Sequence, residues 1–140
     1  MALWLCKQEP GCYSFDDLVR DGRTVWDGVN NALARKHLRQ MRPGDRVLFY
    51  HTGKEKAIVG EMVVAGEPRP DPNGDEAAVA VEMKPVRKLA RPIALAEIKA
   101  DKALANWDLV RLSRLSVVPV TESQWKRVEA LAAKKESKSK

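Results

Sequence analysis

The spacing of hydrophobic residues along the chain predicts a series of strands with a few helices between them. From Ala77 onward, apolar and polar side chains alternate, with Val79, Val81 and Met83 on one side. A period of two is typical of a half-buried strand. Apolar runs predict further strands at residues 3–6, 46–51, 57–64 and 109–120. Gly60, inside one of these runs, indicates a bulge or the close approach of another group.

A helical spacing recurs in three places. Ala34, Leu38 and Met41 follow one another at i, i+4 and i+7, which puts them on one face of a helix. Ser14 and Thr121 each begin a capping box, in which a hydroxyl and a polar side chain three residues later satisfy the first backbone amides of a helix. We therefore expect short helices after Ser14 and Thr121 and a basic helix between them.

The order of these elements indicates the architecture. The strands at 46–51, 57–64 and from 77 onward follow one another through turn-sized links, so they are expected to pair antiparallel. A chain of 140 residues with 44% hydrophobic residues is long enough for one core. We predict an α+β fold, a small curved and mainly antiparallel β-barrel of about five or six strands with peripheral helices.

Composition excludes several classes of protein. No stretch approaches the roughly 20 apolar residues of a membrane span, and the first residues do not resemble a signal peptide, so we expect a cytoplasmic protein. Cys6 and Cys12 fit neither a redox motif nor a zinc cluster, and both are expected to be buried. We expect no metal and no cofactor. The net charge is +6, and half of it falls in residues 134–140, a stretch expected to be a disordered basic tail.

Candidate chemistry is concentrated between Trp26 and His51. Trp26 precedes Asp27 and Gly28, a turn sequence that would present a flat ring outside any periodic core pattern. A basic helix follows, in which His37 is expected to face solvent, and the next strand ends in aromatic and polar residues. These groups together could form a pocket for a planar ligand beside a track of cations for phosphate.

Five short motifs, in order, resemble the EVE domain: WLCKQEP, WDGVNN, GDRVLFYHT, IVGEMVV and RLSRLSV. The resemblance runs from Leu3 to about Leu131, so residues 1–133 are expected to form a single EVE domain. It implies a PUA-like barrel, related in shape to the YTH readers of methylated adenine. It also implies a module that binds a modified nucleobase, such as methylated cytosine or adenine, in DNA or RNA. The expected partner is therefore nucleic acid and no membrane, with a monomeric protein and no catalysis.

The same resemblance assigns roles to individual residues. The implied base-binding pocket consists of Trp26, Lys7, Gln8, Asp27, Asn31, Tyr50, His51 and Ser113. The resemblance also covers Arg35, Arg111 and Arg114, and Arg39 is added from the basic helix. All four arginines are expected to contact phosphate or base edges, and Arg114 is expected to lie in the last strand and point into the cleft because small serines adjoin it. The chain departs from the family pattern where Gln8 replaces a usual Ser and where Asn30 and Ala32 replace a usual Arg and Tyr. These changes affect ligand choice rather than the fold.

Two other functions remain open at this point. Related barrels of the ASCH type include amidohydrolases that act on modified cytidine, and Lys7, Glu9, Thr52 and His51 could serve as acid–base groups. The sequence contains no nucleophile–base pair at a recognisable spacing. A protein-interaction adaptor is the second alternative, although no long exposed apolar stripe supports it.

Overall fold

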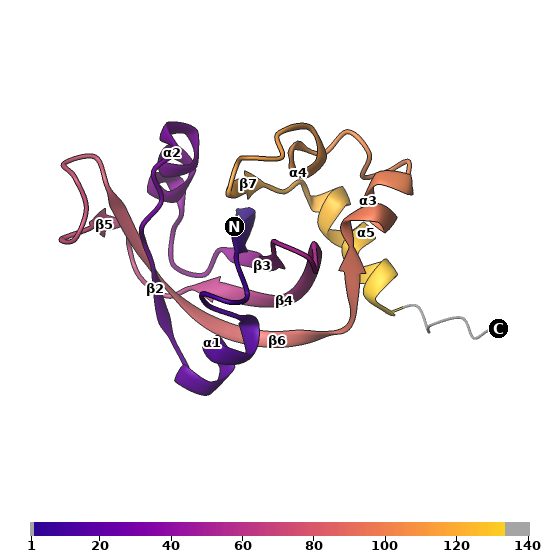
Figure 1. Cartoon of the computed structure of the whole chain (residues 1–140), viewed down its shortest axis with the longest axis horizontal. Helices are drawn as coiled ribbons and strands as arrows, with labels where there is room; N and C mark the ends of the chain where they lie inside the picture. The colour runs from indigo at the N-terminus through magenta and orange to yellow at the C-terminus, as the bar shows by residue number, and fades with distance from the viewer. Residues whose placement is uncertain (1, 134–140) are drawn as a thin grey trace.

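The computed structural model describes residues 2–133, so Met1 and the expected basic tail at 134–140 lie outside the described residues. Within this range the chain forms seven strands and five helices (Figure 1). The strands are β1 (Leu3–Gln8), β2 (Thr24–Trp26), β3 (Arg46–His51), β4 (Ala57–Val64), β5 (Arg69–Pro70), β6 (Val79–Ala94) and β7 (Val117–Pro119). The helices are α1 (Phe15–Asp21), α2 (Ala32–Gln40), α3 (Leu95–Ala100), α4 (Asp108–Arg111) and α5 (Glu122–Ala133).

A single curved sheet organises the fold. Its strand order is β2-β6-β4-β3-β1-β7, and β5 pairs with β6 as a short flap. The expected antiparallel pairing of β3 with β4 and of β4 with β6 is confirmed. β1 instead runs parallel to β3, which is possible because α1, β2 and α2 form the crossover between them. Figure 1 shows β6 sweeping across most of the molecule. The predicted α+β fold with a mainly antiparallel, curved sheet is confirmed.

The two faces of the sheet carry different partners. Successive side chains on a strand point to opposite faces, and the parallel register sets Lys7 beside Tyr50 and Gln8 beside His51. On one face, Phe15 of α1 packs edge-on against Phe49 at 5.4 Å between ring centroids. We call this the α1 face. On the opposite face, here called the α5 face, the guanidinium of Arg46 lies 4.5 Å from the ring centroid of Trp125.

Gly60 allows α1 to reach the sheet. The pairing registers shift beside it in β4, as expected for a bulge. A Cβ at this position would lie 2.5 Å from a ring carbon of Phe15, which is closer than real Cβ contacts. Both sequence-based expectations for Gly60 are therefore confirmed, because the strand is irregular there and a neighbouring ring occupies the space of a side chain.

Both predicted capping boxes are present. The hydroxyl of Ser14 accepts from the Asp17 amide at 3.1 Å, and the Asp17 carboxylate accepts from the Ser14 amide at 2.9 Å. Thr121 and Gln124 make the equivalent pair at 3.1 and 2.9 Å. These local pairs satisfy amides that a helix start leaves without partners, so the starts of α1 and α5 follow from the sequence.

The prediction of one long strand over residues 109–120 is wrong. Residues 108–111 form α4, a turn follows, and only Val117–Pro119 pair with β1. The amides of Arg111 and Leu112 bond back to the carbonyls of Trp107 and Asp108, which closes a helical turn. The apolar run over this segment instead belongs to a helical turn and a bend whose leucines, Leu109 and Leu115, both enter the core.

Two smaller expectations are also wrong. Cys6 is buried in the core as expected, but Cys12 is exposed in the loop before α1. His37 does not face solvent, because it is half-buried with its ring 5.6 Å from that of Trp4. Its Nδ1 is buried and has no hydrogen-bond partner among residues 2–133, and burial lowers the pKa of the imidazole. None of the helices in the described range is long and apolar enough to cross a bilayer.

Candidate functional site

A small cavity opens on the α1 face where β1 ends beside β2. It has a volume of about 180 Å³ and is lined by Gln8, Tyr13, Thr24, Val25, Trp26 and Asp27. The wall therefore combines aromatic rings, an amide, a hydroxyl and a carboxylate. The space is smaller than the roughly 300–1,000 Å³ of pockets for drug-sized ligands, which suits a single heterocyclic ring. We call it the β2 cavity.

Trp26 lines the β2 cavity, but it also belongs to the hydrophobic core. It is the last residue of β2, only 4% exposed, and meets Phe49 edge-on at 5.4 Å with an interplanar angle of 89°. The expectation that this tryptophan lies on a turn outside the core is therefore wrong. The exposed loop begins one residue later, at Asp27 and Gly28. Trp26 contributes a rigid inner wall rather than a freely presented ring.

Gln8 and Tyr13 supply polar groups to the β2 cavity. The Gln8 side-chain oxygen accepts from the Glu9 amide at 3.0 Å, so its nitrogen remains as a donor. The Tyr13 hydroxyl donates to Asp21 at 2.9 Å, and burial together with this carboxylate raises the pKa of the phenol. Sequence reasoning missed Tyr13, which stands in a loop with no periodic pattern. Its position directly before the Ser14 cap is the one local signal that it would be held near the sheet.

Asp27 contributes the negative charge of the site. It is exposed, and within residues 2–133 its carboxylate makes no hydrogen bond or ion pair. Gly28 follows with φ at 71°, a conformation that favours glycine, and turns the chain away from the sheet. Asp27 also borders a second cavity of about 270 Å³ against the loop at 71–78. A free carboxylate between two cavities is an acceptor available to a ligand.

Three of the other expected pocket residues lie on the α5 face instead. Lys7 neighbours Tyr50 in the parallel register, with its ammonium 5.7 Å from the centroid of that ring. The same ammonium donates to the carbonyl of Ser113 at 2.9 Å. Burial lowers the pKa of Lys7 and raises that of Tyr50. The structure thus brings Lys7, Tyr50 and Ser113 together, but separates them from Trp26 and Gln8 by the thickness of the sheet.

The side chains of His51 and Asn31 are already hydrogen-bonded within the protein. The Nε2 of His51 accepts from the Phe15 amide at 3.0 Å, so Nδ1 carries the proton and donates to Glu55 at 2.7 Å. Asn31 caps α2, with its side-chain oxygen accepting from Ala34 at 2.9 Å. His51 therefore holds α1 against the sheet on the same face as the β2 cavity, and neither ring nitrogen is available to a ligand.

The four arginines expected to contact phosphate differ in how free they are. Arg35 is 8% exposed and is held by the Val29 carbonyl at 2.6 Å and by Asp75 at 3.0 Å. Arg111 pairs with Asp108 at 2.8 Å. Arg114 is exposed and unpaired within the described range, but it lies in the turn after α4 and not in a strand. Its expected position in the last strand is therefore wrong.

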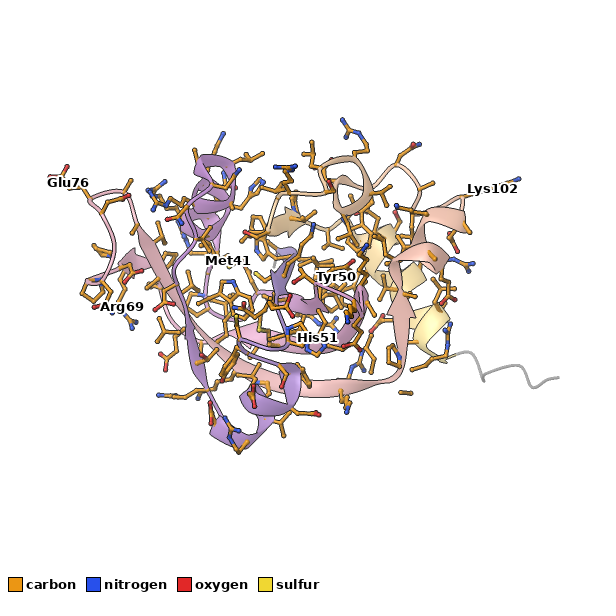
Figure 2. All side chains as sticks on the ribbon, viewed as in Figure 1. Met41, Tyr50, His51, Arg69, Glu76 and Lys102 are labelled. Atoms are coloured by element: carbon orange, nitrogen blue, oxygen red, sulfur yellow. The ribbon has the colours of Figure 1, made fainter. Side chains whose placement is uncertain are left out.

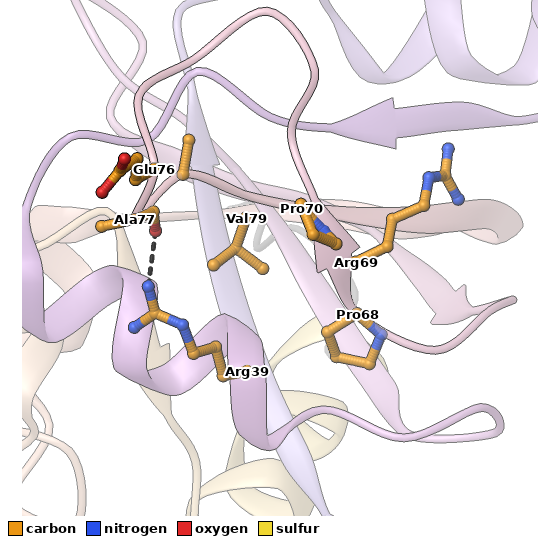
Figure 3. Close-up of a pocket in the computed structure, with 8 residues that line it drawn as sticks. Arg39, Pro68, Arg69, Pro70, Glu76, Ala77 and Val79 are labelled. Atoms are coloured by element: carbon orange, nitrogen blue, oxygen red, sulfur yellow. Dashed lines mark hydrogen bonds between the residues drawn. The ribbon is translucent and has the colours of Figure 1, made fainter.

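Arg39 borders a third cavity, which lies between α2 and the β5–β6 hairpin. Figure 3 shows its guanidinium bonded to the Ala77 carbonyl. The cavity has a volume of about 210 Å³. Pro68, Pro70 and Val79 give this cavity an apolar wall. In Figure 2 the hairpin that carries Arg69 and Glu76 projects at one end of the molecule, well away from Tyr50 and His51. None of the residues that line the Arg39 cavity also lines the β2 cavity.

Comparison with known proteins agrees with this fold. The model of the EVE domain family matches residues 2–131. Human thymocyte nuclear protein 1 is 34% identical, over 96% of this chain and 75% of the human protein. A crystal structure of that human protein in complex with DNA containing 5-methylcytosine superposes with a TM-score of 0.88 at 32% identity, covering 96% of this chain and 99% of the other.

Two further structures define the range of the fold. A protein from Rhodopseudomonas palustris is 40% identical, with a TM-score of 0.89 over 94% of this chain and 93% of its own. An ASCH protein from Zymomonas mobilis shares the fold at 14% identity, with a TM-score of 0.67 over 94% of this chain and 99% of its own. That distant likeness concerns the fold alone. With a family match over nearly all of the described residues, this chain belongs to the EVE domain family.

Proposed function

We propose that this chain is a binding module that recognises a methylated nucleobase, of cytosine or adenine type, in DNA, and that the β2 cavity receives the base. The observation that carries the proposal is the likeness to human thymocyte nuclear protein 1, solved with DNA containing 5-methylcytosine, over 96% of this chain. The β2 cavity adds a site of suitable size, lined by the Trp26 ring, the unpaired carboxylate of Asp27 and the amide of Gln8.

The energetics of methyl recognition favour an enclosed site. One methyl group is worth only about 1–3 kcal/mol of discrimination in an apolar pocket. Contact with aromatic side chains contributes roughly 1–3 kcal/mol per base. A base in a duplex must also be flipped out, which costs a few kcal/mol. Trp26 and Val25 provide apolar contact in the β2 cavity, and contacts to phosphate elsewhere have to offset the cost of flipping.

Phosphate contacts are assigned to the arginines that keep free donors. Arg114 is exposed and unpaired within residues 2–133, and Arg39 uses one nitrogen for the Ala77 carbonyl, which leaves the rest of its donors available. Arg35 is held on several sides by the protein and is proposed to support the loop after Trp26 rather than to bind DNA. Arg111 likewise uses one nitrogen for Asp108 and keeps its other donors, so the proposed phosphate track consists of Arg39, Arg111 and Arg114.

The proposed module binds without catalysis, as a monomer in the cytoplasm. Of the groups considered for acid–base chemistry, His51 uses both ring nitrogens for Phe15 and Glu55. The ammonium of Lys7 is bound to the Ser113 carbonyl. Among residues 2–133, no three His, Cys, Asp or Glu side chains gather in a way that could hold a metal ion. These contacts support binding over hydrolysis.

A binding screen tests the proposal. Fluorescence anisotropy would compare oligonucleotides that contain 5-methylcytosine, N6-methyladenine or no modification, each as DNA and as RNA. We expect a methylated DNA strand to bind about tenfold more tightly than its unmodified counterpart, which corresponds to the contribution of one methyl group. Equal affinities for methylated and unmodified strands would contradict the proposal. Release of a free nucleoside or a deaminated product would point to an enzyme instead.

A further inference from the structure

A protein that recognises 5-methylcytosine in DNA has to distinguish it from another base that carries the same methyl group. Thymine has the same ring size and the same C5 methyl, and it is abundant in DNA. The two bases differ at the Watson–Crick edge, where 5-methylcytosine has an amine at C4 and an unprotonated N3, whereas thymine has a carbonyl at C4 and a proton on N3. An apolar pocket that recognises only the methyl group cannot separate them. Any such discrimination has to come from hydrogen bonds to this edge.

The β2 cavity contains one acceptor and one donor whose roles are fixed by their surroundings. The Asp27 carboxylate can only accept when ionised, and it has no competing partner within residues 2–133. The Gln8 side chain could in principle present either end of its amide. Since the Glu9 backbone N–H can only donate, the Gln8 oxygen must face it, at 3.0 Å, and the NH₂ group is left for the cavity.

The other polar groups of the cavity are less suited to distinguish one Watson–Crick edge from another. The Tyr13 hydroxyl already donates to Asp21 at 2.9 Å. Thr24 lies beside the same phenol oxygen, and a hydroxyl can rotate to donate or accept, so it does not distinguish an amine from a carbonyl. The fixed acceptor and the fixed donor of the β2 cavity are therefore Asp27 and Gln8.

We infer that Asp27 and Gln8 determine base specificity by selecting a base with an exocyclic amine next to an unprotonated ring nitrogen, and by rejecting thymine. This inference rests on the proposed function. The Asp27 carboxylate accepts from the amine, and the Gln8 amide donates to the ring nitrogen. Thymine would set its C4 carbonyl against the carboxylate and its N3–H against the amide N–H, so both contacts become repulsive. Cytosine and adenine share the selected pattern, which defines the ligand class as amino bases.

A reciprocal exchange of the two side chains tests the inference. In the double variant Asp27→Asn with Gln8→Glu, the new amide can donate to the C4 carbonyl of thymine and the new carboxylate can accept from N3–H. The new carboxylate still accepts from the Glu9 amide, so the local contact is kept. Asp27→Asn alone provides an intermediate. Glu122→Gln on α5 is the matched control, since it changes an exposed carboxylate to an amide outside the cavity.

The measurement is the ratio of dissociation constants for two single-stranded DNA oligonucleotides that differ only in 5-methylcytosine or thymine at one position. Single strands remove the cost of base flipping from the comparison. We expect the parent protein and the Glu122→Gln control to bind the 5-methylcytosine strand about tenfold or more tightly than the thymine strand, as edge contacts of this kind provide. We expect Asp27→Asn to lose most of this preference and the double variant to prefer thymine. Unchanged circular dichroism of each variant would show that it is folded.

The possible outcomes separate the inference from the function on which it rests. If the protein prefers 5-methylcytosine over cytosine but binds thymine equally well, or if the exchange leaves the ratio unchanged, the assignment of Asp27 and Gln8 is wrong and the proposed function stands. If the protein does not distinguish 5-methylcytosine from unmodified cytosine, the proposed function fails and the inference fails with it.

Discussion

Adjacent residues of β1 serve different faces of the sheet. Lys7 and Gln8 follow each other in one motif, yet the pleat of β1 directs Lys7 to Tyr50 and Gln8 to the β2 cavity. The sequence contains the signal for this division, because residues on β1 alternate between faces. This division is lost when all residues of the motif are assigned to one pocket. Trp26 shows the reverse, since it lines the cavity and supports the core at once.

Trp26→Ala is expected to destabilise the protein strongly. Removing a buried tryptophan costs about 3–5 kcal/mol, which for a domain of this size lowers the thermal midpoint by roughly 10 °C or more. Val25→Ala is the neighbouring control on the same strand, where the side chain is 39% exposed and only a small shift is expected. A midpoint for Trp26→Ala within about 3 °C of the parent, by differential scanning calorimetry, would show that the ring does not support the core.

The half-buried His37 is expected to make the free energy of unfolding depend on pH at values below the usual pKa of histidine. Burial lowers its pKa from the usual 6.5, so the unfolded chain binds more protons than the folded one as pH falls below that value. The free energy of unfolding should therefore be level above pH 6.5 with respect to this group and should decline as the pH falls towards the lowered pKa. Urea titrations from pH 5 to 8 would show a shallower decline for His37→Gln. Identical slopes for parent and variant would contradict this assignment.

At the scale of elements, local chemistry predicted helix starts and most strands, and failed where tertiary contacts decide. The capping boxes at Ser14 and Thr121 formed as expected because each is complete within four residues. The segment 109–120 was mistaken for a strand, since a single helical turn and a bend can bury the same leucines as alternating positions in a strand. Tyr13 escaped prediction because its place in the cavity depends on how α1 docks, and its position before the Ser14 cap is the one local signal of that docking.

The docking of α1 gives a prediction at this scale. Gly60→Ala would place a methyl group 2.5 Å from the Phe15 ring, and that ring is fully buried and cannot move aside. We expect a loss of about 1–3 kcal/mol in the free energy of unfolding, measured by urea denaturation. Gly66→Ala is the control, with its nearest neighbour 3.4 Å away at the end of the Glu82 side chain. Equal effects of the two substitutions would show that the close contact does not hold α1 in place.

At the scale of the whole molecule, the arginines proposed to contact phosphate lie on different elements from the residues that line the β2 cavity. The β2 cavity carries an unpaired carboxylate, whereas the proposed phosphate contacts are Arg39 on α2, Arg111 on α4 and Arg114 in the turn after it. Recognition of the base and attraction of phosphate are therefore expected to respond differently to ionic strength. In the sequence, the expected cations and the expected pocket for a planar ligand fall within one continuous stretch of the chain. Their separation becomes visible only in the folded sheet.

Salt dependence measures this separation. We expect oligonucleotide affinity to fall steeply between 50 and 200 mM salt, because each phosphate contact releases bound counterions. Affinity for the free nucleoside should barely change. Substitution of Arg114 by Gln should reduce the salt slope by about one contact without changing the preference for the methylated base. Equal salt sensitivity of nucleoside and oligonucleotide binding, by isothermal titration calorimetry, would argue against a phosphate track.

A nuclear magnetic resonance titration would locate the bound base on the protein. Amide and indole signals of the labelled protein would be followed as a single-stranded DNA with one 5-methylcytosine is added. We expect the largest shifts at the Gln8 side-chain amide, the Trp26 indole and the backbone of residues 24–28, which line or adjoin the β2 cavity. Largest shifts at Lys7, Tyr50 and Ser113, with residues 24–28 unmoved, would place the base on the α5 face and contradict the account.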